Sequence, residues 1–451
     1  PFLLFVAAAF LRAQSLAPVS PSQAVEAALK NYPSIRVSQE QIQAASAAIT
    51  LARTAYLPRV DALGQVNRAT RNNVFGLLMP QSVIPPISGP VLGTNNFGTV
   101  WGSALGGLVT WEPFDFGLRR ANTAVAEAAR AQSEAALKRS QFEIAVSAAD
   151  AYLTIAAAQD TVRAAQAGVD RAETVLKTIG ALVDAQLRPG ADRSRAEAEV
   201  AAARTQLIQA QSAVAFARAT LAQFTGGDPA GIAISAPALV RSPAGEAPTT
   251  FNATGNPRMV EQSAAIEQAR AQLKAIERSY FPRFYAQLSA YARGTGAEVN
   301  GVRHGGANGL APTVANAAAG FSVTFPILDR PAIRAREAQQ SATIRAQSAR
   351  AEQIATELRG QWNRAIATYD GARRVAANTP VQTKAARDAT DQATARYRSG
   401  LANIDEVAEA QRLLTQSEID DALARLNVWR ALLAIATATG NLDGFLAEVS
   451  Q

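Results

Sequence analysis

The feature that most constrains this chain is an internal duplication. Tyr56-Leu57-Pro58-Arg59 in the first half has a counterpart in the second half, Tyr280-Phe281-Pro282-Arg283. A stretch rich in helix formers precedes each motif, and an alternating stretch follows it. Proline disfavours helix at the residue before it and cannot continue the helical hydrogen-bond ladder. The motifs therefore predict two equivalent helix-to-strand junctions, at Pro58 and Pro282, within one doubled architecture.

Each half then carries two segments that alternate with the period of a β-strand. The first strands begin at Arg59 and Arg283, and the second strands end at Pro113 and Pro326. Each strand has about ten residues, which is enough to cross a bilayer when tilted. Alternation alone leaves a soluble β-hairpin packed on helices equally open. Trp101 favours the membrane strand, as does Trp111, because aromatic residues gather at membrane interfaces.

Long helical segments follow the strands. Residues 117–187 are rich in Ala, Arg, Glu and Gln and contain no proline, which predicts one long helix or a nearly continuous pair. A segment of this length extends roughly 100 Å as a helix, more than a globular domain needs. Further helices are expected from Asp192 to about Phe224, from Pro331 to about Arg398, and from Ile404 to Thr439. Paired through short breaks, they predict a mainly α fold with long antiparallel coiled-coil hairpins.

The duplication also sets the expected organisation of the chain. The apolar run that ends at Leu11 is shorter than the roughly 20 residues of a spanning helix, so we interpret it as the remnant of a secretory signal peptide. The expected parts are the signal-peptide remnant 1–13, a first structural repeat 14–226, a connector 227–257, a second repeat 258–440 and a C-terminal tail 441–451.

The composition of the chain disfavours most kinds of catalytic and metal-binding site. The chain has no cysteine and a single histidine, His304, which we expect on the surface of a Gly-rich loop. This disfavours thiolate or imidazole metal sites and a cysteine nucleophile, so we expect no metal, no cofactor and no enzyme activity. The net charge is +7, yet the arginines alternate with glutamates along helix-like stretches without interleaved aromatics. We therefore expect no nucleic-acid partner.

Four strands cannot close a barrel, and open strand edges are not tolerated in lipid. Closure would need other subunits. Three copies would supply twelve strands and, from four long helices each, a barrel of twelve helices.

The doubled order of helix, Tyr-x-Pro motif, strand, loop, strand, proline turn and helical hairpin resembles the TolC-type outer-membrane efflux protein family. The resemblance covers nearly the whole chain after residue 13. It implies a homotrimer with a 12-stranded β-barrel in the lipid of the outer membrane and an α-barrel that crosses the periplasm of a Gram-negative bacterium. It also implies a passive exit duct of a tripartite efflux or type I secretion system, with a periplasmic adaptor (membrane fusion) protein and an inner-membrane pump as partners.

The resemblance places the functional residues at the two hairpin tips, where glycines shape the turns and acidic residues narrow the periplasmic entrance. For the tips and the adaptor contact, the corresponding residues are Pro189, Gly190, Gly400, Leu401 and Ala402. For the pore constriction they are Asp192, Asp405, Glu406 and Glu409. Glycine suits such turns because it adopts positive φ without strain. The acidic residues could instead simply stabilise helix N-termini, as Asp192 would if it were an N-cap.

Two functions from different classes remain open on the sequence alone. The first is the exit duct, for which the transported substrate is not readable. The second is a secreted coiled-coil scaffold without channel activity, which predicts a soluble protein whose strands are buried among helices.

Overall fold

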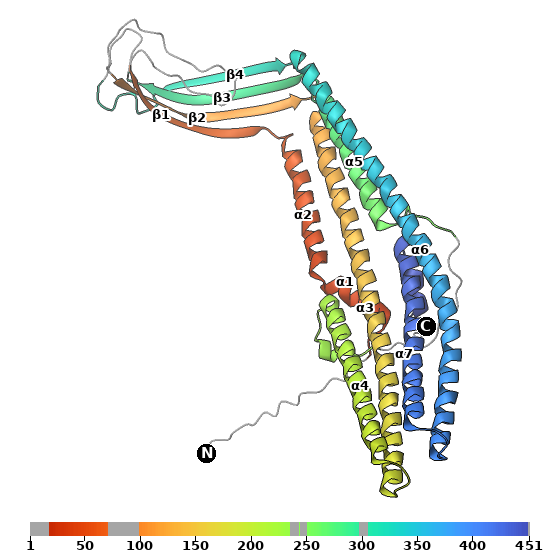
Figure 1. The fold of residues 1–451 in the computed structure, drawn as a ribbon. Helices are drawn as coiled ribbons and strands as arrows, with labels where there is room; N and C mark the ends of the chain where they lie inside the picture. The colour runs from red at the N-terminus through yellow and green to blue at the C-terminus, as the bar shows by residue number, and fades with distance from the viewer. Residues whose placement is uncertain (1–17, 71–98, 235–242, 244–249, 297–304, 450–451) are drawn as a thin grey trace, which may run out of the picture. The chain divides into compact units, whose positions relative to one another are not determined.

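The structure is a computed structural model that describes residues 18–70, 99–234, 243, 250–296 and 305–449. The expected signal-peptide remnant 1–13 and His304 lie outside the described residues. The chain is mostly helical with one small sheet (Figure 1). The first half contains α1 (Pro21–Asn31), α2 (Pro33–Thr54), β1 (Arg59–Thr70), β2 (Thr99–Phe114), α3 (Leu118–Asp184), α4 (Gly190–Thr225) and the short η2 (Pro229–Gly231). The second half contains α5 (Pro257–Arg278), β3 (Arg283–Thr295), β4 (Val314–Thr324), the short η4 (Ile327–Asp329), α6 (Arg330–Arg398), α7 (Ile404–Thr439) and α8 (Asp443–Val449).

The duplication expected from sequence is present in the element lengths. Helices α2 and α5 each have 22 residues, α3 and α6 have 67 and 69, and α4 and α7 each have 36. Both α4 and α7 end at a left-handed glycine, Gly226 with φ 75° and Gly440 with φ 81°. Glycine occupies such C-terminal positions because it has no Cβ to clash there. The two halves are therefore built on the same pattern.

Some boundaries differ from the sequence expectation. Helix α1 starts after Ser20, whose hydroxyl accepts a hydrogen bond from the Gln23 amide in a capping box. Pro113 lies inside the end of β2, at an irregularity between Trp111 and Phe114. A proline is tolerated there because the local ladder is already interrupted. The C-terminal tail carries α8, which was not predicted.

The four strands form one antiparallel sheet in the order β1-β2-β3-β4. Both β1 and β4 are edge strands. The register places Val60 opposite Val109, Val109 opposite Leu288, and Leu288 opposite Ala319. Since side chains alternate between faces, these aligned residues share one face across all four strands. The sheet therefore has one continuous apolar face.

That apolar face is the exposed one. Val60 is 70% exposed, Leu288 is 54% exposed and Phe321 is 63% exposed. On the opposite face, Gln287 and Ser289 are only 3% and 1% exposed. This reverses the usual arrangement of a half-buried sheet in water, in which the apolar face is covered. The sequence-predicted alternation is confirmed, and the apolar side of it is unpartnered within the described chain.

Contacts divide the chain into two compact units that do not coincide with the two sequence repeats. One unit comprises Pro1–Glu40, Glu134–Gln262 and Arg350–Gln451, and the other comprises Gln41–Ser133 and Ser263–Ala349. The second unit holds the sheet. In the first unit, one apolar cluster contains Tyr152, fully buried, whose hydroxyl donates to the Val19 carbonyl at 3.0 Å. Each unit thus draws on both halves of the chain.

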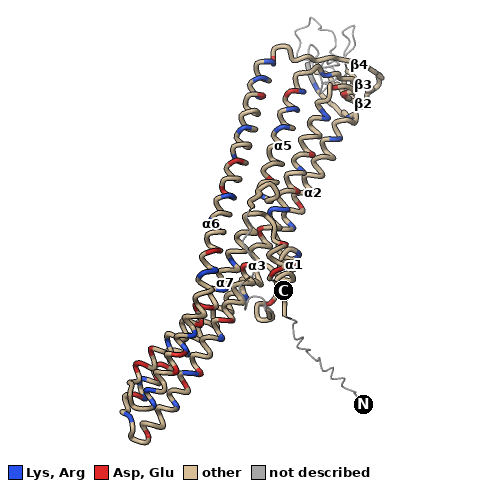
Figure 2. The backbone as a smooth tube through the Cα atoms, turned by 90° about the vertical axis from the view of Figure 1, so that its right-hand side faces the viewer, with Lys and Arg blue, Asp and Glu red and all other residues tan. Residues whose placement is uncertain are grey.

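Among the described residues, no helix has an apolar stretch that would suffice to cross a membrane. Lys and Arg alternate with Asp and Glu along the helices (Figure 2). Many are paired, as Arg139 is with Glu143 and Glu261. The positive net charge is therefore spread over the helical surfaces.

Candidate functional site

The first hairpin tip joins α3 to α4. The amide of Leu187 donates to the Leu182 carbonyl at 2.8 Å, which closes the end of α3, and Gln186 adopts a positive φ of 61°. Pro189 has φ −64° and is the N-cap residue of α4, so Gly190 begins the helix. Proline suits this position because its fixed φ near −65° is compatible with the extended backbone found here, where ψ is 147°, and because no helical hydrogen bond requires its missing amide hydrogen. The expectation that Gly190 takes positive φ is wrong: Gln186 carries that conformation.

The second tip joins α6 to α7 and matches the expectation. Gly400 has φ 79°, and the amide of Leu401 donates to the Arg396 carbonyl at 2.8 Å. The Asn403 side chain then accepts from the Glu406 amide at 3.0 Å and caps α7. A residue with a Cβ would be strained at Gly400, since that region of φ is open chiefly to glycine. This turn is therefore set by its glycine and its asparagine cap.

Four contacts join the two tips. The Tyr397 hydroxyl on α6 donates to an Asp192 carboxylate oxygen on α4 at 2.9 Å. The Arg188 guanidinium lies over the Tyr397 ring, 4.4 Å from its centre, and donates to the Tyr397 carbonyl at 2.6 Å. Arg195 forms an ion pair with Asp405 at 2.5 Å. The tips are thus linked by polar contacts that the sequence did not predict, because nothing in the spacing relates α4 to α6.

Tyr397 is the centre of this link. Its side chain is 2% exposed and packs in an apolar cluster with Ile179, Ile404 and Val407. Burial raises the pKa of Tyr397 to about 12, and the hydrogen bond to Asp192 acts in the same direction. The hydroxyl therefore stays protonated and able to donate throughout the physiological pH range.

Three of the four acidic residues predicted at the constriction lie beside an arginine, while Asp192 accepts from the Tyr397 hydroxyl. Asp405 pairs with Arg195, Glu406 lies 3.9 Å from Arg396, and Glu409 lies 3.2 Å from Arg412. Their side chains are 47%, 48% and 75% exposed. Exposed pairs of this kind contribute little to stability, about 0–1 kcal/mol each. The structure adds an arginine beside Asp405, Glu406 and Glu409, which sequence reasoning missed.

The predicted adaptor-contact residues differ in their surroundings. Leu401 is 72% exposed, and Leu187 in the other tip is 69% exposed. Ala402 is only 8% exposed and belongs to the apolar cluster around Tyr397. Ala402 therefore stabilises the tip from inside, which corrects the expectation that it offers contact surface.

The junction prolines occupy the ends of the strands as expected, apart from the shift at Pro113. Pro58 and Pro282 precede β1 and β3, and Pro326 precedes η4. The sequence did not identify the residue that holds the first junction, Arg119. It is 8% exposed, pairs with Asp115 at 3.0 Å, donates to the Ala55 carbonyl at 3.2 Å and stacks on Tyr56.

The second junction repeats part of this arrangement. Arg330 lies over the Tyr280 ring, 5.1 Å from its centre, and donates to the Tyr280 hydroxyl at 3.2 Å. Each Tyr-x-Pro motif thus presents its tyrosine ring to an arginine at or near the start of the following long helix.

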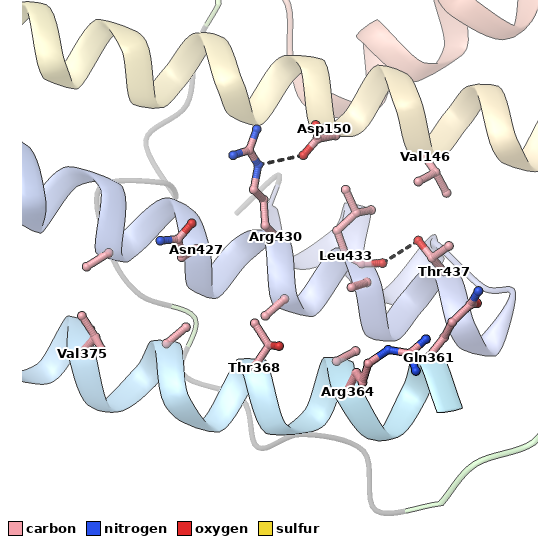
Figure 3. A pocket seen from close by; sticks show the side chains of 15 residues that line it. Val146, Asp150, Gln361, Arg364, Thr368, Val375, Asn427, Arg430, Leu433 and Thr437 are labelled. Carbon is pink, nitrogen blue, oxygen red and sulfur yellow. Dashed lines mark hydrogen bonds and ion pairs between the residues drawn. The ribbon is translucent and has the colours of Figure 1, made fainter. Parts of the chain in front are cut away.

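A cavity of about 730 Å³ lies between α3, α6 and α7 (Figure 3). Arg430 of α7 reaches α3, where it donates to Asp150 at 2.9 Å and to Thr154 at 2.8 Å (Figure 3). Much of the remaining lining is alanine, such as Ala365, Ala424 and Ala431. Alanines at these positions resemble those elsewhere on the helices, so no sequence signal marks this cavity.

The chain matches a known family over most of its length. The sequence profile of the family described as outer membrane efflux protein matches residues 24–227 and 253–441. No curated protein sequence matches the chain.

Several solved structures share the fold. The outer-membrane channel OprN is 21% identical with a TM-score of 0.70, over 93% of this chain and 90% of that one. The Campylobacter jejuni CmeC outer membrane channel is 14% identical with a TM-score of 0.73, over 93% and 85%. The open state of the Neisseria gonorrhoeae MtrE outer membrane channel is 19% identical with a TM-score of 0.71, over 93% and 89%.

Proposed function

Because the chain belongs to the outer membrane efflux protein family, we propose that three copies of it form the exit duct of a tripartite efflux or type I secretion system. Its location is the outer membrane, and its role is that of an efflux or secretion channel rather than an enzyme. Transport through the proposed duct is passive, and the energy comes from an inner-membrane pump.

The observation that carries the proposal is the sheet. It has one exposed apolar face, and both of its edge strands, β1 and β4, are open within one chain. An open edge is costly in lipid because its amide and carbonyl groups have no partners there. Pairing β4 of one copy with β1 of the next would satisfy these groups. Three copies would then close a barrel of twelve strands with the apolar face toward lipid.

The helices would continue this duct on the periplasmic side. The four long helices α3, α4, α6 and α7 of each copy would form the wall of an α-barrel. The two tips would form its entrance, with Asp192, Asp405, Glu406 and Glu409 around the opening. The contacts of Tyr397 and Arg188 would hold the tips of one chain together in the closed state.

The exposed ends of the tips would meet the periplasmic adaptor protein. Leu187 and Leu401 supply apolar surface there, and Pro189, Gly190 and Gly400 shape the turns that present it. Single exposed leucines are common on protein surfaces, so their location at both tips is the reason for this assignment.

To test the proposal, the full chain is expressed, and its cell fraction, oligomeric state and conductance are measured. The exit duct predicts a protein that fractionates with the outer membrane, needs detergent for extraction, runs as a trimer and conducts ions in planar bilayers. A secreted scaffold predicts a water-soluble protein without conductance, and that result would exclude the duct. The exposed apolar face of the sheet disfavours the scaffold, which requires the strands to be buried among helices.

A further inference from the structure

A groove lies on the exposed apolar face of the sheet, next to the first junction. Its volume is about 420 Å³. Its apolar lining comes from the junction, β2 and β3, namely Tyr56, Pro58, Val109, Trp111, Ala286 and Leu288. Gln287 also borders it, but its side-chain amide donates to Thr110, at 3.4 Å. The groove is thus an apolar slot with aromatic residues at the helix side of the sheet.

The rim of the groove is held in place by the backbone of the junction. The Trp111 indole N–H donates to the Tyr56 carbonyl at 3.2 Å, and the Tyr56 ring is covered by Arg119. Both aromatic side chains are still 43% exposed. A tryptophan or tyrosine with one polar contact and an exposed ring is typical of the boundary between lipid and water.

From these features we infer that the groove binds an acyl chain of a glycerophospholipid in the periplasmic leaflet of the outer membrane. This inference rests on the proposed function for the orientation of the sheet, with its apolar face toward lipid. The groove lies at the helix side of the strands, which is the periplasmic side in that orientation. Its lining continues the apolar face formed by Val60, Leu105 and Phe321, so an acyl chain in the groove stays in contact with apolar surface.

A second copy of the chain is a poorer occupant. Copies that join β4 to β1 cover the edges of the sheet, whereas the groove lies over β2 and β3. The occupant therefore has to come from the surroundings of the apolar face. In the proposed orientation, that face is surrounded by membrane lipid.

The experiment fills the groove without changing the polarity of the face. Ala286→Phe places a ring in the groove, and Ala317→Phe is the matched control, because Ala317 is an exposed alanine of β4 on the same face and outside the groove. Each full-length protein is extracted in mild detergent, and retained glycerophospholipid is counted by native mass spectrometry. We expect the wild type and Ala317→Phe to retain about one lipid per chain, and Ala286→Phe to lose it.

A second measurement uses the fluorescence of Trp111. This signal is obtained by subtracting the fluorescence of Trp111→Phe from that of the protein that keeps Trp111. In bilayers with brominated acyl chains, the Trp111 fluorescence is expected to be quenched, and Ala286→Phe is expected to reduce that quenching relative to Ala317→Phe. Equal lipid retention and equal quenching in the two alanine variants would overturn the inference. Retention of a lipid A species alone would also overturn it, since that would place the site in the other leaflet.

Conductance separates this inference from the proposed function. If the wild type and both alanine variants conduct as trimers while lipid retention does not depend on Ala286, only the lipid site is wrong. A wild type that neither trimerises nor conducts would remove the membrane placement itself.

Discussion

The link between the two hairpin tips gives a direct prediction about the closed channel. Tyr397→Phe removes one hydroxyl, and with it the 2.9 Å hydrogen bond to Asp192. The ring remains, so the packing in the apolar cluster and the stacking of Arg188 are kept. The substitution therefore isolates one bond between α4 and α6.

The size of the effect follows from the charge of the acceptor. A hydrogen bond to a charged group contributes about 1.5–3 kcal/mol, and 1.4 kcal/mol corresponds to tenfold in an equilibrium. If the bond exists only in the closed entrance, the closed state should lose roughly ten- to 150-fold in relative population for each chain. Tyr397 is buried, so solvent does little to weaken this bond.

The assay is the open probability of single channels in planar bilayers. Tyr152→Phe is the matched control, because it also removes a buried hydroxyl, whose 3.0 Å bond to Val19 lies in a core cluster that does not include the tips. Tyr397→Phe should open more often than wild type, and Tyr152→Phe should not. Equal open probability in wild type and Tyr397→Phe would refute the reasoning.

Three further predictions concern the same tips. Ile179 is fully buried there, so Ile179→Ala should lower the free energy of unfolding by about 2–5 kcal/mol and lower the melting temperature. Leu187 is exposed, so Leu187→Ala should change the free energy of unfolding by less than about 0.5 kcal/mol. Equal losses in the two variants would contradict the packing around Ile179. Because the pKa of Tyr397 is raised to about 12, the stability from its hydrogen bond to Asp192 is fully present below the ordinary tyrosine pKa of about 10. This stability is lost as pH rises through about 12. In an ultraviolet titration, the difference between wild type and Tyr397→Phe should therefore show one tyrosine that titrates late, and an ordinary titration would contradict this. Replacing both Asp405 and Glu409 by alanine should weaken block of the conductance by multivalent cations, and unchanged block would remove these residues from the entrance.

Sequence reasoning succeeded where the signal is local and repeated. The limits of α7, from Ile404 to Thr439, were predicted as they are found, and α6 begins one residue before the predicted Pro331. A proline, a glycine turn or a change of period marks each of these places along the chain itself. The two Tyr-x-Pro junctions were found for the same reason.

The failures share a different cause. Gly190 was expected to carry the positive φ of its turn, but it is the first residue of α4 after the N-cap Pro189, and Gln186 carries the positive φ. The pair of Arg195 with Asp405 and the bond from Tyr397 to Asp192 join segments far apart in sequence. Only the packing of two hairpins places them together, and no spacing rule encodes that packing.

In the proposed barrel, β4 of one copy pairs with β1 of the next, and introduced cysteines can test this pairing because the sequence contains none of its own. A cysteine at Ala62 in β1 would be combined in turn with one at Ala315, Ala317 or Ala319 in β4, all on the exposed face. Within one chain two strands separate these positions by about 14 Å, too far for a disulfide. Oxidation of outer membranes should therefore give covalently linked trimers in at least one combination. Protein that remains monomeric in every combination, while still reaching the membrane, would contradict the closed barrel.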